Sequence, residues 1–168
     1  MTEDTRMQRG RVWLEKLLQL MGVSPSVEAH LEATQIEGKK EPDNYWLTID
    51  ATKLTPEQID ILIGSEGSVL DAIQYLANAT LNLNQSPTDQ ASYTVELNGY
   101  RVRRQAEVQA IAQAAAEQVR ASGQEVEIKS LSSAERRQVH TFLKTFPDLE
   151  TFSKGKEPHR HLVVRQLQ

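Results

Sequence analysis

The sequence of 168 residues predicts an α+β fold built from two successive modules. Segments with apolar residues at helical spacing are interspersed with short segments in which apolar and polar residues alternate, as in half-buried strands. The charge is also divided: residues 1–98 carry 7 Lys and Arg against 15 Asp and Glu, whereas residues 99–168 carry 12 against 8. Net charges of −8 and +4 in the two parts indicate two functional surfaces.

The first module is expected to follow the order helix, strand, strand, helix, helix, strand. Residues 1–8 lack periodicity and are predicted to be a disordered tail, and Leu14 to Met21 follow with helical spacing. Strands are predicted at 27–33 and 45–49, joined as a hairpin through a turn-rich loop around 38–44.

Start and stop signals predict the rest of this module. A capping box of Thr55 and Gln58 opens a short helix that ends before Gly64. A second helix begins near Gly67, and a third strand at 93–97 completes the order.

The second module begins with a long helix between Gly99 and Gly123, whose Ala-rich sequence has high helix propensity. A short strand is predicted at 125–131. The remaining elements are a helix from 132 to 146, which a capping box of Ser132 and Glu135 opens, and strands at 151–153 and 162–164.

The composition excludes several classes of protein. The sequence has no Cys, which excludes disulfides, thiol catalysis and Cys ligation of zinc or iron–sulfur clusters. Neither a membrane span of roughly 18 apolar residues nor the apolar region of a signal peptide is evident, so a cytoplasmic protein is expected. The His residues show no metal-ligand spacing with Asp or Glu, and we predict neither a metal site nor a cofactor.

A Gly-x-x-Gly turn between two helices is the first candidate binding site. Gly64 and Gly67 allow a tight backbone turn, and the helix that follows presents free N–H groups that attract anions. Ser65 and Glu66 lie between the glycines, and an exposed carboxylate there would repel a phosphate by about 1 kcal/mol. The turn is therefore either a place for a phosphodiester backbone or a plain helix–helix turn.

The second candidate is the helix that contains Arg136 and His140. Residues four apart share a helix face, and Arg137 and Lys144 fall within the same arc of about 100°. The pattern predicts either a cationic binding stripe beside the core face or a solvated face. Like charges around His140 disfavour its protonated form and no carboxylate partner is evident, so we predict that the protein is not an enzyme.

The first module resembles a KH type II domain, whose Gly-x-x-Gly loop clamps about four nucleotides. The second resembles the R-3-H domain, a family that binds single-stranded nucleic acid and is named for an Arg and a His separated by three residues. This second resemblance is carried by residues 135–140, 146–147 and 150–164. A KH domain at 9–98, followed by a linker helix and R-3-H domain at 99–168, is the order of the bacterial Jag family. That family is also called KhpB or SpoIIIJ-associated, and the small N-terminal domain that many of its members carry is not expected here.

The resemblance implies a protein that binds single-stranded RNA in post-transcriptional regulation, with a small KH-only protein or a second copy as a partner. The implied nucleic-acid-binding residues are Gly64, Ser65, Glu66, Gly67, Arg136, Arg137, His140, Lys144, Lys154, Lys156 and Arg160. Replacement of both Arg136 and His140 by Ala is expected to weaken RNA binding at an unchanged thermal midpoint. Single-stranded DNA is an alternative ligand, because no motif reports recognition of the 2′-hydroxyl.

A protein-interaction or dimerisation scaffold is the alternative function, motivated by Glu66 and by the acidic first part of the chain.

Tyr75 and Tyr100 could stack on bases, but their amphipathic contexts predict core positions for both. His159 and His161 are predicted to alternate along a strand and to point to one face, near the phosphate contacts.

Overall fold

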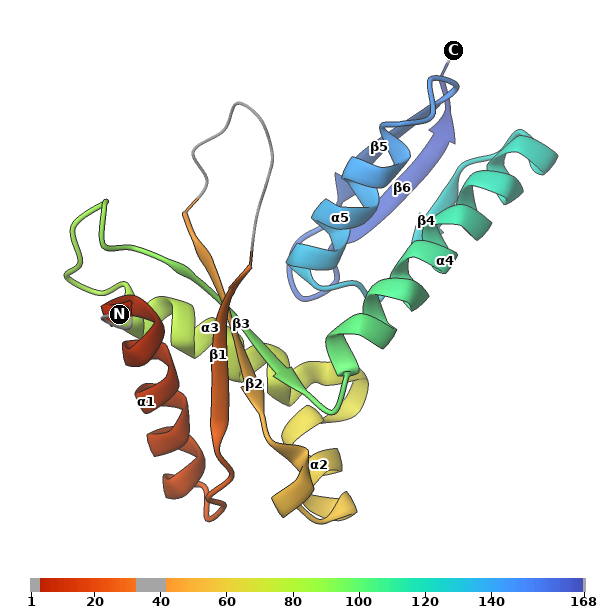
Figure 1. The fold of residues 1–168 in the computed structure, drawn as a ribbon. Coiled ribbons are helices and arrows are strands. Elements are labelled where there is room, and N and C mark those ends of the chain that lie inside the picture. Colours follow the sequence, from red (N-terminus) through yellow and green to blue (C-terminus); the bar gives the residue numbers. More distant parts are fainter. Residues whose placement is uncertain (1–3, 33–41, 168) are drawn as a thin grey trace. The chain divides into compact units, whose positions relative to one another are not determined.

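The computed structural model describes residues 4–32 and 42–167, which form two compact units (Figure 1). The first unit ends at Arg101 and the second begins at Val102, inside the long helix α4 (Tyr100–Ser122). Each unit combines helices with a three-stranded sheet, which confirms the predicted α+β class.

The first unit follows the predicted order of elements. They are α1 (Thr5–Leu20), β1 (Val27–Glu32), β2 (Asn44–Ile49), α2 (Pro56–Ile63), α3 (Ser68–Leu81) and β3 (Ser92–Leu97), with short 3₁₀ turns η1 (Ala51–Lys53) and η2 (Ser65–Gly67). The capping box of Thr55 and Gln58 is present at the start of α2.

The prediction of a disordered tail at 1–8 is wrong for residues 5–8, which form the first turns of α1. The Asp4 carboxylate caps this helix by accepting a hydrogen bond from the Arg6 backbone N–H at 2.9 Å. The Arg6 guanidinium binds back to Asp4 at 3.0 Å and across to Asp43 at 2.8 Å. A cap and ion pairs, which hydrophobic periodicity does not report, therefore extend the helix, while residues 1–3 lie outside the described residues.

The strands of the first unit form one sheet in the order β1-β2-β3. β1 and β2 are antiparallel, as the predicted hairpin requires, and Val27 lies opposite Ile49. β2 and β3 are parallel because α2 and α3 form the crossover connection between them. The loop predicted inside the hairpin falls largely on residues 33–41, which are outside the described part of the chain.

Alternation along these strands places one set of side chains in a core with α1 and α3. Its largest fully buried members are Tyr45, Tyr93, Leu14, Leu18, Leu47, Ile49, Leu70, Leu97 and Val95. Tyr100 packs against this core, as predicted. The prediction for Tyr75 is wrong, because its side chain on α3 is 73% exposed and the neighbouring Leu76 is 46% exposed.

Amide side chains of α3 and of its C-cap, Asn82, cover the outer edge of β3 and of the residue before it. Asn78 accepts a hydrogen bond from the Tyr93 N–H at 2.9 Å and donates to the Tyr93 carbonyl at 2.8 Å. Asn82 forms the same pair of bonds with Ala91, and Gln74 accepts from the next outward N–H along the strand. Three amides at successive helical turns therefore occupy main-chain groups that an edge strand would otherwise present to another strand.

The second unit contains the rest of α4, β4 (Val126–Ile128), α5 (Ser133–Leu143), β5 (Leu149–Lys154) and β6 (His161–Gln166). Its antiparallel sheet has the order β4-β6-β5. Helix α5 ends earlier than predicted, because the backbone N–H groups of Thr145 and Phe146 bond three residues back and tighten the chain into a turn.

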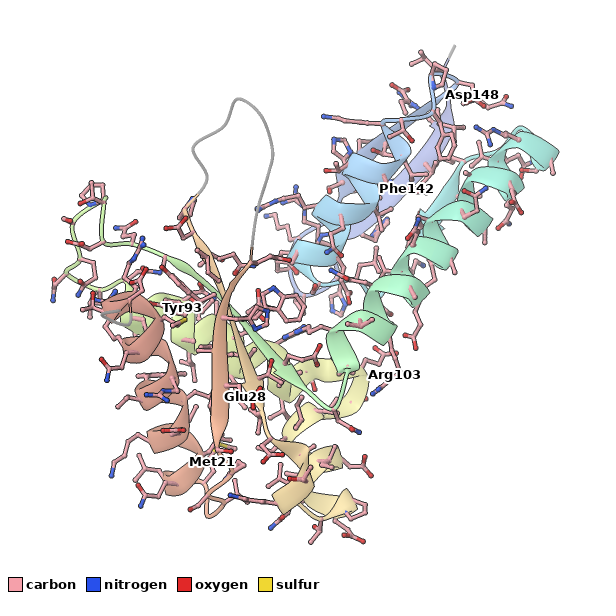
Figure 2. All side chains as sticks on the ribbon, in the orientation of Figure 1. Met21, Glu28, Tyr93, Arg103, Phe142 and Asp148 are labelled. Atoms are coloured by element: carbon pink, nitrogen blue, oxygen red, sulfur yellow. The ribbon has the colours of Figure 1, made fainter. Side chains whose placement is uncertain are left out.

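Helices α4 and α5 pack on the same face of this sheet (Figure 1). The small side chains of Ala112, Ala115 and Ala116 let α4 approach closely, whereas Ile111 on the same helix is 39% exposed. Asp148, labelled in Figure 2, pairs with Arg120 at 2.7 Å. The hydrogen bond from Arg120 holds the pKa of the Asp148 carboxyl below its usual value.

No helix within residues 4–32 and 42–167 is both long enough and apolar enough to cross a membrane. Over the same ranges, no three His, Asp or Glu side chains gather where they could hold a metal ion.

Candidate nucleic-acid interface

Helix α5 is fixed at its N-terminus by the predicted capping box, which the structure confirms. Ser132 Oγ accepts a hydrogen bond from the Glu135 N–H at 3.2 Å, and the Glu135 carboxylate accepts one from the Ser132 N–H at 2.9 Å. Arg104 Nε on α4 lies 2.7 Å from the same carboxylate. These contacts set the direction of α5 and thereby the positions of the side chains along it.

A groove in the second unit is lined by side chains of α5, β5 and the β5–β6 loop. One part is a cavity of about 340 Å³, lined by Ser133, Arg136, Arg137, His140, Phe152, Ser153, Glu157 and Arg160. The other is a cavity of about 310 Å³, lined by His140, Leu143, Lys144, Phe146, Pro147, Leu149, Glu150 and Thr151. His140 belongs to both, and we refer to the two cavities together as the α5–β5 groove.

Three exposed cations line the α5–β5 groove, Arg137, Lys144 and Arg160. Two more exposed cations, Lys154 and Lys156, are next in the chain to the lining residues Ser153 and Glu157. None of the five forms a salt bridge with another residue in the part of the chain that the structure describes. The two carboxylates that line the groove are already paired, Glu157 with Arg136 and Glu150 with Arg165. The carboxylates that line the groove therefore leave its positive charge without a neutralising partner.

Arg136 is placed differently from the other basic residues, because it is only 7% exposed. Its Nη1 donates to the carbonyls of Leu131 at 2.8 Å and Arg160 at 3.2 Å. Its Nη2 donates to Ser133 Oγ at 3.2 Å and to the Glu157 carboxylate. The guanidinium thus connects the loop after β5 to the start of α5. Arg136 therefore holds two walls of the groove in place by hydrogen bonds.

His140 lies half-buried at the junction of the two cavities. Its Nδ1 is hydrogen-bonded to Thr151 Oγ1 on β5. This contact fixes the ring between helix and strand and leaves Nε2 as the nitrogen that a ligand can use. The prediction that Arg136 and His140 lie on the same side of the helix is confirmed. The Arg136 side chain is buried and holds the loop by hydrogen bonds, whereas the His140 ring is half-exposed.

In the first of the two cavities, four residues were not among the predicted binding residues: Ser133, Phe152, Ser153 and Glu157. Phe152 is 37% exposed, and the Arg165 guanidinium lies 5.0 Å from the centroid of its ring. An aromatic residue two positions before Lys154 is a signal that could have identified it. Ser153 and Glu157 depend on which strand lies beside α5, which local sequence does not report, and Ser133 is the first residue of α5 itself.

The prediction that His159 and His161 point to one face of a strand is wrong. β6 begins only at His161, and His159 lies in the turn before it, with its carbonyl 3.2 Å from His161 Nδ1. His161 Nε2 lies 3.6 Å from the carboxylate of Glu127 on β4. The two rings therefore belong to different surroundings, and neither lines the α5–β5 groove.

The Gly-x-x-Gly turn belongs to the first unit, where both glycines have a packing role. Gly64 has φ of 74°, and a Cβ there would lie 2.5 Å from Val69 Cγ2. Gly67 has φ of 77° and is buried, and a Cβ there would lie 2.2 Å from the Tyr100 hydroxyl. Ser65 and Glu66 are exposed between them, and Glu66 itself adopts a left-handed φ of 52°.

Comparison with known proteins gives a domain family for the second unit and several relatives that cover most of the chain. Residues 106–166 match the R-3-H domain, the family that the sequence predicts for the second module. The chain is 25% identical over 162 residues to RNA-binding protein KhpB of Clostridium symbiosum, which covers 96% of this chain and 67% of that protein. It is 32% identical over 118 residues to RNA-binding protein KhpB of Lactiplantibacillus plantarum, covering 70% of this chain and 34% of that protein.

A third relative is RNA-binding protein KhpB of Bacillus subtilis, which is 30% identical over 113 residues, 66% of this chain and 53% of that protein. The chain thus spans between one third and two thirds of the length of these relatives.

Proposed function

The chain belongs to the Jag family of KhpB proteins, and we propose that it binds single-stranded RNA through the α5–β5 groove. The observation that carries the proposal is the set of five exposed cations around a groove whose carboxylates are already paired. Phosphates of a bound strand would meet charge that is not neutralised, which favours binding at low salt. His140 and Phe152 line the same groove and can stack on bases, a contact worth roughly 1–3 kcal/mol per base.

The Gly-x-x-Gly turn has a smaller part in this proposal. Its accessible portion is Gly64, Ser65 and Glu66, because Gly67 is covered by Tyr100. A phosphate near Ser65 would meet the N-terminus of α3 but also the Glu66 carboxylate, and these act in opposite directions. We therefore assign most of the RNA affinity to the second unit. For the whole chain we propose a role in post-transcriptional regulation, which its resemblance to the Jag family implies.

The test is fluorescence anisotropy of a labelled single-stranded RNA pool with the full chain and two double variants. Arg137→Ala with Lys144→Ala removes two cations from the groove. Lys53→Ala with Lys129→Ala removes the same net charge from exposed positions outside it. We expect the groove variant to bind about tenfold more weakly than wild type at low salt and the control to remain within about twofold. An equal loss of RNA affinity in both variants would show that binding depends on net charge rather than on the groove, and would contradict the proposal.

Protein docking on the first unit is the second candidate function. It is favoured by two exposed apolar side chains, Ile61 at 68% on α2 and Tyr75 at 73% on α3. Light scattering across a concentration series discriminates the two functions. A chain that self-associates and fails to bind RNA would support docking, whereas a monomer that binds RNA would leave it without support.

A further inference from the structure

β5 is an edge strand, and its open side lies on the α5–β5 groove. In the described part of the second unit, β5 pairs only with β6. Phe152 and Ser153 line one cavity of the groove, and Leu149, Glu150 and Thr151 line the other. The wall of the groove opposite α5 is therefore formed by a strand with one unpaired edge.

The register of the sheet determines which main-chain groups point into this open edge. The Leu167 N–H donates to the Asp148 carbonyl at 2.9 Å, directly before the first pair of the ladder, Leu149 with Gln166. Residues that exchange hydrogen bonds alternate along an antiparallel pair, so that every second residue from Asp148 onward faces β6. The N–H and C=O groups of Thr151 and Ser153 consequently point away from β6.

Leu149 also faces outward, but its N–H donates to the Phe146 carbonyl at 3.3 Å. The next two outward-facing residues, Thr151 and Ser153, are spaced for nucleotides whose bases are splayed apart. Two residues along an antiparallel strand rise about 6.8 Å, which is about twice the rise of a nucleotide in a stacked strand. Single-stranded RNA is recognised mostly with its bases unstacked and with their edges hydrogen-bonded. Each base presents a donor and an acceptor side by side on its Watson–Crick edge, and the N–H and C=O of one outward-facing residue present the same pair.

The charge around this edge favours a nucleic acid over a peptide strand as its occupant. Arg137 and Lys144 lie along the opposite wall, and Lys154 and Arg160 lie beyond Ser153. An exposed Lys at a strand edge also opposes pairing with another strand. In the first unit, by contrast, side-chain amides of α3 cover the edge of β3. Of these two edge strands, β3 has a covered edge, whereas the uncovered edge of β5 lies beside cations.

We propose that the main-chain N–H and C=O groups of Thr151 and Ser153 bind the base edges of the single strand held in the α5–β5 groove. This inference rests on the proposed function and adds to it how bases are recognised. Phosphates lie toward the cations of α5 and of the β5–β6 loop, and bases turn toward β5. Because main-chain groups match all four bases, the edge contributes affinity for bases with little preference among them.

Two substitutions at Ser153 test the inference. Ser153→Pro removes the outward N–H, and Pro is tolerated at an edge position whose N–H is not part of the ladder. Ser153→Ala removes the hydroxyl and keeps the N–H, which makes it the matched control. Each variant is titrated with a single-stranded RNA and with an abasic strand of the same length, which has the phosphates without the bases.

We expect Ser153→Pro to weaken binding of the RNA about two- to tenfold and to leave binding of the abasic strand unchanged. Ser153→Ala, which keeps the N–H, is expected to bind the RNA more tightly than Ser153→Pro and to bind the abasic strand as Ser153→Pro does. Equal effects of Ser153→Pro on the two strands, or no effect on either, would overturn the inference. If the wild-type chain itself binds neither strand, the proposed function fails, and the edge has no nucleic acid to bind.

Amide hydrogen exchange of the wild-type chain provides a readout that needs no substitution. The N–H groups of Thr151 and Ser153 are expected to exchange quickly in the free protein, unlike that of Phe152, which lies within the ladder. Saturating RNA should slow both at least tenfold, and the abasic strand should not. Exchange at these two amides that RNA leaves unchanged would contradict the inference, even where the Pro variant does not fold.

Discussion

Removal of two groove cations should change the salt dependence of RNA binding by an amount that the structure predicts. Each phosphate neutralised on a single strand contributes about 0.7 to the slope of log affinity against log salt. Five exposed cations surround the α5–β5 groove, so the wild-type slope is expected to be about −3.5. Arg137→Ala with Lys144→Ala leaves three, which reduces the expected slope to about −2.1.

These slopes separate clearly in a titration. Between about 50 and 200 mM salt, the affinity of the wild-type chain should fall about 130-fold and that of the groove variant about 20-fold. The assay is fluorescence anisotropy with one labelled single-stranded RNA at four or more salt concentrations. Lys53→Ala with Lys129→Ala is the control of equal net charge. A groove variant with the wild-type slope, or a control whose slope falls equally, would refute the assignment of phosphate contacts to this groove.

Four further predictions concern single residues. Arg136→Ala should lower the free energy of unfolding by about 2–3 kcal/mol in chemical denaturation, because two carbonyls lose a buried donor. An unchanged thermal midpoint, as the sequence alone predicts, would contradict this. Asp4→Asn keeps the helix cap but removes a carboxylate whose pKa the Arg6 side chain holds well below its ordinary value near 3.8. It should therefore cost about 1 kcal/mol at neutral pH. The difference from wild type in pH-dependent melting should shrink as pH falls below that ordinary value and vanish once pH falls below the lowered pKa of the folded state. A difference that persists in strong acid would exclude this origin. Gly67→Ala should destabilise the chain by about 1–3 kcal/mol in thermal melts, since its Cβ would overlap Tyr100, whereas Ser65→Ala should have little effect. Glu66→Asn should raise affinity for RNA two- to fivefold in anisotropy if phosphates pass the turn, and no gain would exclude the turn from the interface.

Local patterns predicted those elements whose signals are local. The capping boxes at Thr55 and Ser132 specify the starts of α2 and α5, because the bonds they make join residues three apart. Period-two alternation predicted the strands of the first sheet, because one face of that sheet is buried. The start of α1 was missed, because Asp4 acts as its cap and Arg6 binds Asp43, which is distant in sequence.

The sequence predicted which residues lie at the candidate site better than it predicted what each of them does there. Helical spacing placed Arg136, Arg137 and His140 on one side of α5, and the structure brings them to one groove. Spacing alone does not report burial, so that it gave Arg136 and Arg137 the same role. The loop that covers Arg136 returns from β5, and only the fold brings Glu157 to its guanidinium.

The open edge of β5 could not be predicted from local sequence either. The pattern around Thr151 and Ser153 predicts a strand, but the position of that strand at the outside of the sheet follows from the order β4-β6-β5. Tyr75 illustrates the same limit, since its spacing on α3 resembles that of core residues while its side chain is exposed. In each case a distant part of the chain decides what a locally correct element contacts.

The most direct test of the central claim is to map amide chemical shifts of the full chain during titration with single-stranded RNA. We expect the largest changes in residues 133–144 and 149–160, with smaller ones near Ser65. Changes confined to residues 64–71, or none at all at saturating RNA, would contradict the assignment of binding to the α5–β5 groove.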